Sequence, residues 1–152
     1  MNDPATGPHG CDVDALNSLL RGEIAAVATY DQAIGKFEAK AIASELRHIR
    51  DEHQRAVVAL RERVTTFGGT PSDGAGAWGE FASAVTEAAK FLGPATAISA
   101  LQQGEQHGIN QYEEVLGNEA VDAECKNLVR SDLLPKSRAH VTELDRLLGS
   151  AN

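Results

Sequence analysis

Residues 38–67 read EAKAIASELRHIRDEHQRAVVALRERVTTF and contain no proline. Their hydrophobic residues recur at intervals of three and four, which places them on one face of an α-helix. Gly68-Gly69 and then Pro71 end the pattern. The segment therefore predicts a long amphipathic helix, and a histidine interrupts its hydrophobic face. That face consists of Ile42, Leu46, Ile49, His53, Val57 or Ala56, Leu60, Val64 and Phe67.

Three further segments repeat the helical spacing. One covers residues 12–37, and a short hairpin connection is expected between it and the helix just described. The other two cover residues 94–116 and 119–148. Pro135 lies inside the last of these and predicts a kink or a break after Leu134. Since no segment shows the alternation typical of a β-strand, we expect an all-α protein.

The stretch GGTPSDGAGAWG, residues 68–79, is the only long loop-like segment. In a four-helix bundle this is the natural place for a crossover connection between two hairpins. A short extra helix is expected over residues 78–92, before the Gly93-Pro94 break. We therefore predict an up-down-up-down four-helix bundle over residues 12–149, preceded by a flexible tail over residues 1–11.

The composition argues against several classes of function. Lys+Arg number 14 and Asp+Glu number 22, so the formal net charge is -8. This charge disfavours binding to nucleic acid and to anionic membranes. No apolar run approaches the ~20 residues that span a bilayer, and residues 1–10 do not look like a secretory signal. With only Cys11 and Cys125, no disulfide framework is expected, and we predict a cytoplasmic location.

Polar residues interrupt the predicted core at one position of each helix. These are Glu23, His53, Glu105 and His140. Because a buried, unpaired carboxylate costs several kcal/mol, such residues need a partner. They can pair with one another, or they can share a cation. Carboxylate oxygens and imidazole nitrogens suit zinc, iron and manganese, and bundles build metal sites from such side chains on facing helices.

A tyrosine follows each glutamate by seven residues, on the same helix face. Tyr30 and Tyr112 either pack in the core with their hydroxyl near a partner, or donate hydrogen bonds to the site. His48 and Glu52 lie away from the His53 stripe, so we assign them to a solvated helix face. His107 lies two residues after Glu105, so it points away from the Glu105 face of the helix.

These residues resemble the ferritin-like superfamily, whose members include bacterioferritin and rubrerythrin. The family pattern is a glutamate with a tyrosine seven residues later, followed on the next helix by Glu-x-x-His, and both elements occur twice. The resemblance extends from about residue 12 to residue 148, and it implies a ferritin-like bundle that self-associates, with a dimer as one option. The matching residues are Glu23, Tyr30, His53, Glu105, Tyr112 and His140.

More narrowly, the chain resembles a branch of small bacterial ferritin-like proteins of unknown function. The resembling stretches are Leu16-Asn17-Ser18-Leu19-Leu20, Gly68-Gly69-Thr70-Pro71, Gly104-Glu105 and Leu133-Leu134-Pro135.

The chain departs from the family pattern at both bridging glutamates, since Arg50 and Ser137 stand three residues before the two histidines. Two metals held close together need such bridging charge to offset their repulsion. We therefore expect a single divalent ion, bound by the two glutamates and two histidines, rather than a di-iron centre. Alternatively, the Arg50 guanidinium reaches Glu23 or Glu105 and replaces the cation. The protein would then be a metal-free bundle with a structural or interaction role.

Two further expectations follow. An oxidase or peroxidase activity ranks last, because it needs the bridging carboxylates that are missing. The fourth helix must also start late, or kink at Pro135, for His140 to come level with Glu105.

Overall fold

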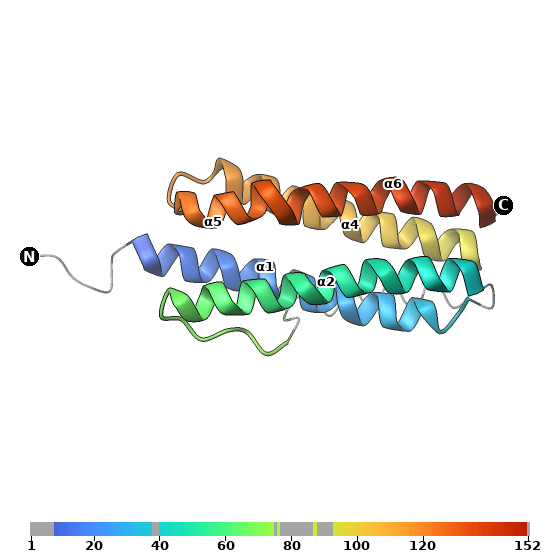
Figure 1. The fold of residues 1–152 in the computed structure, drawn as a ribbon, viewed down its shortest axis with the longest axis horizontal. Coiled ribbons are helices and arrows are strands. Elements are labelled where there is room, and N and C mark those ends of the chain that lie inside the picture. Colours follow the sequence, from blue (N-terminus) through green and yellow to red (C-terminus); the bar gives the residue numbers. More distant parts are fainter. Residues whose placement is uncertain (1–7, 38–39, 75, 77–86, 88–92, 152) are drawn as a thin grey trace, which may run out of the picture.

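The computed structural model describes every residue except 1–7, 38–39, 75, 77–86, 88–92 and 152, and these described residues form helices and no strands (Figure 1). The predicted all-α class and the predicted four-helix bundle are confirmed. The predicted short helix over residues 78–92 falls almost wholly outside the described part. The helices are α1 (Pro8–Ile34), α2 (Lys40–Thr66), α4 (Pro94–Gly117), α5 (Ala123–Leu128), the π-helical turn η2 (Val129–Leu133) and α6 (Leu134–Ala151).

The helices form two hairpins, α1 with α2 and α4 with α6, packed side by side (Figure 1). α1 and α6 run in one direction, whereas α2 and α4 run in the other. The order is therefore up-down-down-up, which corrects the predicted up-down-up-down order. The reason is that α2 ends at one end of the bundle and α4 begins at the other, so the crossover spans its length. α1 begins at Pro8, within the stretch expected to be a tail, and α6 ends at Ala151.

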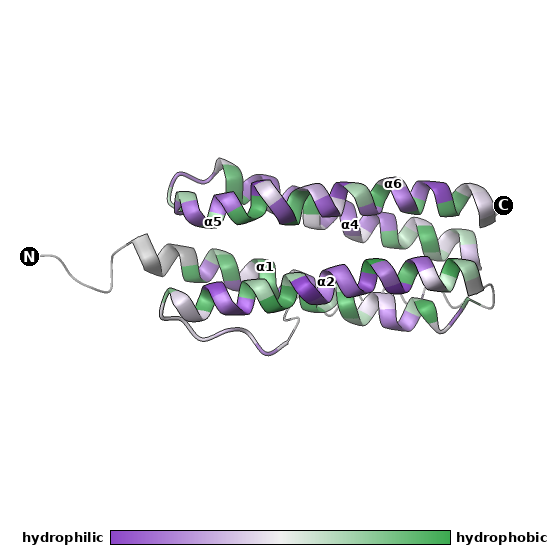
Figure 2. Ribbon diagram, viewed as in Figure 1, coloured by the Kyte–Doolittle hydropathy of each residue, from purple (hydrophilic) through white to green (hydrophobic). Residues whose placement is uncertain are grey.

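The described residues form two hydrophobic core clusters, one toward each end of the bundle. Figure 2 shows hydrophobic and polar residues alternating along each helix at helical intervals. One cluster joins the first half of α1 to the second halves of α2 and α4, and it includes Leu20, Leu60 and Val129. The other, which includes Ile49 and Leu144, joins the opposite ends of the same helices and α6. A layer of buried polar side chains lies between the two clusters.

The start of the crossover is fastened to α1. Gly68 has a φ of 82°, the left-handed conformation that ends α2 and that glycine adopts without steric cost. Asn17 on α1 then donates from Nδ2 to the Thr70 carbonyl at 3.0 Å and accepts from the Ser72 N–H at 2.9 Å. A side chain at Gly69 would collide with Val13, which lies 2.5 Å from the position of its Cβ.

The fourth helical segment begins at Ala123, later than the expected residue 119, and its α-helix is interrupted just before Pro135, where the sequence predicts a kink or a break. The Asp122 side chain accepts from the Glu124 N–H at 2.7 Å and caps α5. In η2, the Leu134 N–H bonds to the Val129 carbonyl five residues earlier. Pro135 has no N–H to donate, so a regular α-helix would also lack a hydrogen bond at this position. The π-helical turn η2 ends here.

None of the described helices combines the length and the apolar character that crossing a membrane requires.

Candidate metal centre

The four polar core residues lie at one height in the bundle. Glu23 is eleven residues before the end of α1, and His53 is thirteen residues after the start of α2. Glu105 is eleven residues after the start of α4, and His140 is eleven residues before the end of α6. All four counts start from the same end of the bundle (Figure 1). At about 1.5 Å of rise per residue, the four side chains come level, and each is only 4–6% exposed.

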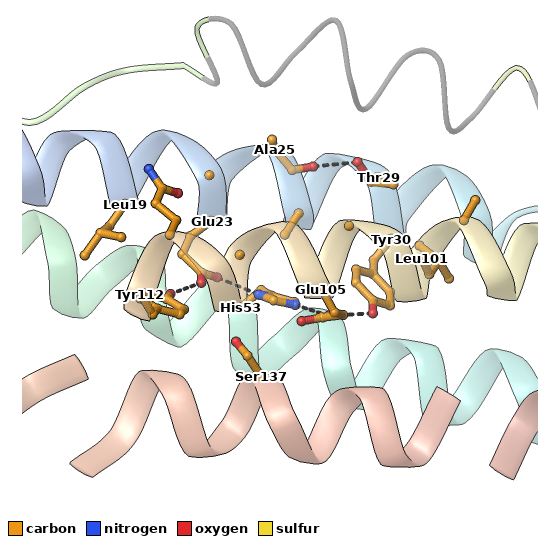
Figure 3. A pocket seen from close by; sticks show the side chains of 16 residues that line it. Leu19, Glu23, Ala25, Thr29, Tyr30, His53, Leu101, Glu105, Tyr112 and Ser137 are labelled. Atoms are coloured by element: carbon orange, nitrogen blue, oxygen red, sulfur yellow. Dashed lines mark hydrogen bonds and ion pairs between the residues drawn. The ribbon is translucent and has the colours of Figure 1, made fainter. Parts of the chain in front are cut away.

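His53 lies between two carboxylates. Its Nδ1 is 2.5 Å from Glu23 Oε2, and its Nε2 is 2.7 Å from Glu105 Oε1 (Figure 3). Burial by itself lowers the pKa of His53, but the Glu105 and Glu23 carboxylates outweigh it and raise that pKa well above 6.5. Likewise, burial alone raises the pKa of Glu105, whereas His53 and His140 bring that pKa below its ordinary value. The cluster therefore favours a proton on His53 and charge on Glu105.

Each tyrosine donates to the glutamate of the other hairpin. Tyr30 on α1 donates to Glu105 Oε1 at 2.7 Å, and Tyr112 on α4 donates to Glu23 (Figure 3). Burial, together with the carboxylate that each hydroxyl faces, raises the pKa of both tyrosines well above 10.0. The hydroxyls therefore keep their protons and act as fixed donors. Both tyrosines are thus buried in the core, with the hydroxyl on a buried carboxylate.

His140 is held less tightly than His53. Its Nδ1 lies 3.4 Å from Glu105, and its ring centroid lies 4.8 Å from that of His53. His140 Nε2 is buried and has no hydrogen-bond partner in the part of the chain that the structure describes. One ligand atom each from His53, Glu105 and His140 lie within 4.8 Å of one another, close enough to share one metal ion.

Arg50 does not reach the buried carboxylates. Its Nη1 lies 2.5 Å from Asp31 and its Nε lies 2.9 Å from Asp51, both on the surface. The sequence-based idea that Arg50 replaces the cation is therefore wrong for this structure. The physical reason is that Asp31 offers the guanidinium a partner in solvent, which avoids the cost of burying it. Ser137, at the matching position of α6, is buried at 4% exposure.

Glu52 belongs with this site, although the sequence assigns it to a solvated face. Its side chain is only 17% exposed, and Oε2 lies 3.6 Å from His140 Nε2. Helical spacing could not reveal this, because Glu52 is one residue from His53 and lies about 100° around the helix. Only the contact with α6, a feature of the packed structure, brings it to the site.

Small residues leave space beside the cluster. A cavity of about 50 Å³ lies between α1 and α4 and reaches Glu23, His53 and Glu105 (Figure 3). Gly22, Ala26 and Gly104 are among the residues that line it. This volume exceeds what one water molecule needs.

A family described as "Domain of unknown function (DUF2383)" matches residues 12–118. The chain belongs to this family. The DUF2383 match contains Glu23, His53 and Glu105, and it ends before His140. No curated protein matches the chain.

A solved structure described as "ferritin like, diiron-carboxylate proteins from Bacillus anthracis str. Ames" is similar to this DUF2383 chain. The sequences are 21% identical, the match covers 94% of this chain and 99% of that chain, and the TM-score is 0.74. This similarity establishes the ferritin-like fold.

Proposed function

We propose that this protein binds one divalent metal ion in the middle of the bundle, with His53, Glu105 and His140 as ligands. The observation that carries the proposal is the placing of three buried ligand atoms within 4.8 Å of one another. Two imidazoles and a carboxylate are a ligand set typical of zinc, iron or manganese. The similar Bacillus anthracis structure is described as one of diiron-carboxylate proteins, which is compatible with this proposal.

In this proposal Glu23 acts through His53. A ligating histidine usually has a carboxylate or carbonyl on its other nitrogen, which fixes the orientation of the ring. Glu23 occupies this place on His53 Nδ1 at 2.5 Å, and Tyr112 in turn holds Glu23. Tyr30 holds Glu105 in the same way. The ligands are thus positioned by buried partners before an ion arrives.

The charges favour one ion rather than two. A proton on His53 leaves the two buried glutamates with one uncompensated negative charge, whereas a divalent ion neutralises both. A second ion close by would need carboxylates that bridge the two ions and offset their repulsion. Arg50 points to the surface and Ser137 carries no charge, so neither hairpin supplies one three residues before its histidine.

When bound, the ion would supply a buried positive charge and, if it were iron or manganese, redox capacity. The protein's own residues would bind it, keep bulk water away and hold the protons of the two tyrosines. The cavity of about 50 Å³ beside Glu105 leaves room for a water molecule next to this centre.

The test is elemental analysis of protein purified without a histidine tag. We expect about one equivalent of zinc, iron or manganese per chain, and loss of this metal in the Glu105→Gln and His53→Ala variants. The His107→Ala variant is the matched control, because His107 is exposed on α4 two residues from Glu105. Equal metal content in all four proteins would rule out the core site.

A metal-free structural role is the second candidate. Its specific support is that both His53 nitrogens already lie at hydrogen-bond distance from carboxylates, so a proton alone can hold the cluster together. Under this alternative, a chelator leaves the melting temperature unchanged. Under the metal proposal, the chelator lowers it, because a ligand that binds only the native state stabilises that state.

A further inference from the structure

His140 and Glu52 face each other across the α2–α6 interface in a way that needs an explanation. Their nearest atoms, His140 Nε2 and Glu52 Oε2, are 3.6 Å apart. This distance is too long for a hydrogen bond, and among the described residues His140 Nε2 has no other hydrogen-bond partner. A buried polar nitrogen without a partner is costly, so a third group shared by the two side chains is the natural explanation.

The two nitrogens of His140 face different carboxylates. Nδ1 lies 3.4 Å from Glu105, whereas Nε2 faces Glu52 across 3.6 Å. An imidazole nitrogen and a carboxylate oxygen are both metal-ligand atoms. A cation between Nε2 and Glu52 would bond to both side chains.

The spacing fits a cation. With bonds of about 2.0–2.2 Å, two ligands of a tetrahedral ion are roughly 3.4 Å apart, close to the observed 3.6 Å. A small cavity of about 10 Å³ lies here, and Glu52, His140 and Asp132 are among its lining residues. Lys136 also lines it, but its ammonium is paired with Asp132 at 2.8 Å.

We propose that Glu52 and His140 Nε2 form an outer cation position, through which a divalent ion reaches the core site. This inference rests on the proposed function, since His140 serves both positions. A neutral His140 has only one lone pair, so it binds an ion on one side of the ring at a time. The outer position therefore passes an ion inward rather than storing a second one.

Graded burial marks a route from the surface. His48 is 66% exposed, and its Nε2 lies 2.9 Å from Glu52 Oε1. Glu52 is 17% exposed, and its other oxygen faces His140, which is 5% exposed. Ligand atoms thus succeed one another from solvent to the core, and a cation can exchange water for protein ligands one step at a time.

The experiment uses the full, untagged chain after chelator treatment, with Co²⁺ alone as the probe and its visible absorbance as the signal. We expect the Glu52→Gln variant to bind Co²⁺ at least tenfold more slowly than the wild type at limiting Co²⁺. Glu62→Gln is the matched control, because it removes the same charge from an exposed position of α2 and should bind at the wild-type rate. Equal rates in Glu52→Gln and the wild type would overturn the outer position.

A second measurement isolates the outer position from the core. In a Glu105→Gln background we expect weak residual Co²⁺ binding, which Glu52→Gln then removes. Binding that depends on Glu52 but not on Glu105 would keep the outer position and overturn the core site. Binding that needs Glu105 and is unaffected by Glu52 would do the reverse, and no Co²⁺ binding in the wild type would overturn both.

Discussion

The two hairpins supply the same residue types to the core but hold them differently. In the α1–α2 hairpin, His53 lies 2.5 Å from Glu23 and uses its second nitrogen as well. In the α4–α6 hairpin, His140 lies 3.4 Å from Glu105, and its Nε2 makes no hydrogen bond to any residue that the structure describes. Both nitrogens of the first hairpin's histidine are thus hydrogen-bonded, whereas the second hairpin's histidine keeps a nitrogen that can still bind a ligand.

The difference extends to the backbone. The first hairpin carries its histidine on the unbroken helix α2, whereas in the second a π-helical turn, η2, precedes α6. Such turns are rare and occur frequently at functional sites. η2 also contributes Asp132 to the small cavity that His140 lines. A repeated sequence pattern can therefore give one hairpin whose histidine has both nitrogens hydrogen-bonded and one whose histidine keeps a nitrogen for a ligand.

Replacing each of the two histidines should give the largest difference in stability between the hairpins. His53→Ala leaves two buried carboxylates without their shared proton, so we expect a loss of about 3–5 kcal/mol in the free energy of unfolding of the metal-free protein. His140→Ala removes two longer contacts, with Glu105 at 3.4 Å and with Glu52 at 3.6 Å, and should cost about 1–2 kcal/mol. Urea unfolding of chelator-treated protein measures both. Equal losses would show that the two hairpins are held alike.

The two tyrosines should give a smaller and more even effect. Tyr30→Phe and Tyr112→Phe each remove one buried donor from a carboxylate, at about 1–3 kcal/mol. Each hydroxyl links α1 to α4, so both changes weaken the contact between the hairpins by similar amounts. Thermal unfolding of the two single variants tests this. A loss of thermal stability in only one of the two variants would mean that only that tyrosine holds the two hairpins together.

Much of this arrangement was predictable from spacing alone. Stripes at intervals of three and four place Glu23, His53, Glu105 and His140 on inward faces, and all four are buried. The late start of the last helix also follows, because Pro135 and the need for level residues constrain it. These predictions succeed because a helix turns by a fixed angle per residue.

Other features depend on contacts between helices, which spacing does not encode. Arg50 has the right position to reach the core, yet Asp31 on α1 holds it at the surface. Glu52 has the wrong position on its helix, yet packing brings it to within 3.6 Å of His140 on α6. The direction of α4 depends on how far the crossover travels, and no residue pattern states that distance.

The pH dependence of stability gives the smallest effect and the sharpest separation of the metal-free and metal-bound states. The pKa of His53 is raised above 6.5 in the folded protein, so its contribution is full below pH 6.5 and is lost as the pH rises through the folded pKa. The pKa of Glu105 is lowered, so its contribution is present above pH 4.5 and is lost as the pH falls through its folded pKa. These two groups therefore favour maximal stability of the metal-free protein between about pH 4.5 and 6.5, with a loss of at most about 1.4 kcal/mol per pH unit above that range.

A bound divalent ion needs His53 without its proton, so the stabilisation that the ion provides should grow as the pH rises above 6.5. Urea unfolding of the metal-free protein from pH 6.5 to 8 should thus show stability falling as the pH rises, and Co²⁺ should remove this fall, because the metal-bound protein holds no proton on His53 to lose. His53→Gln should remove the difference between the two curves. Parallel slopes would mean that His53 keeps its proton whether or not the ion is present, which would exclude His53 as a ligand.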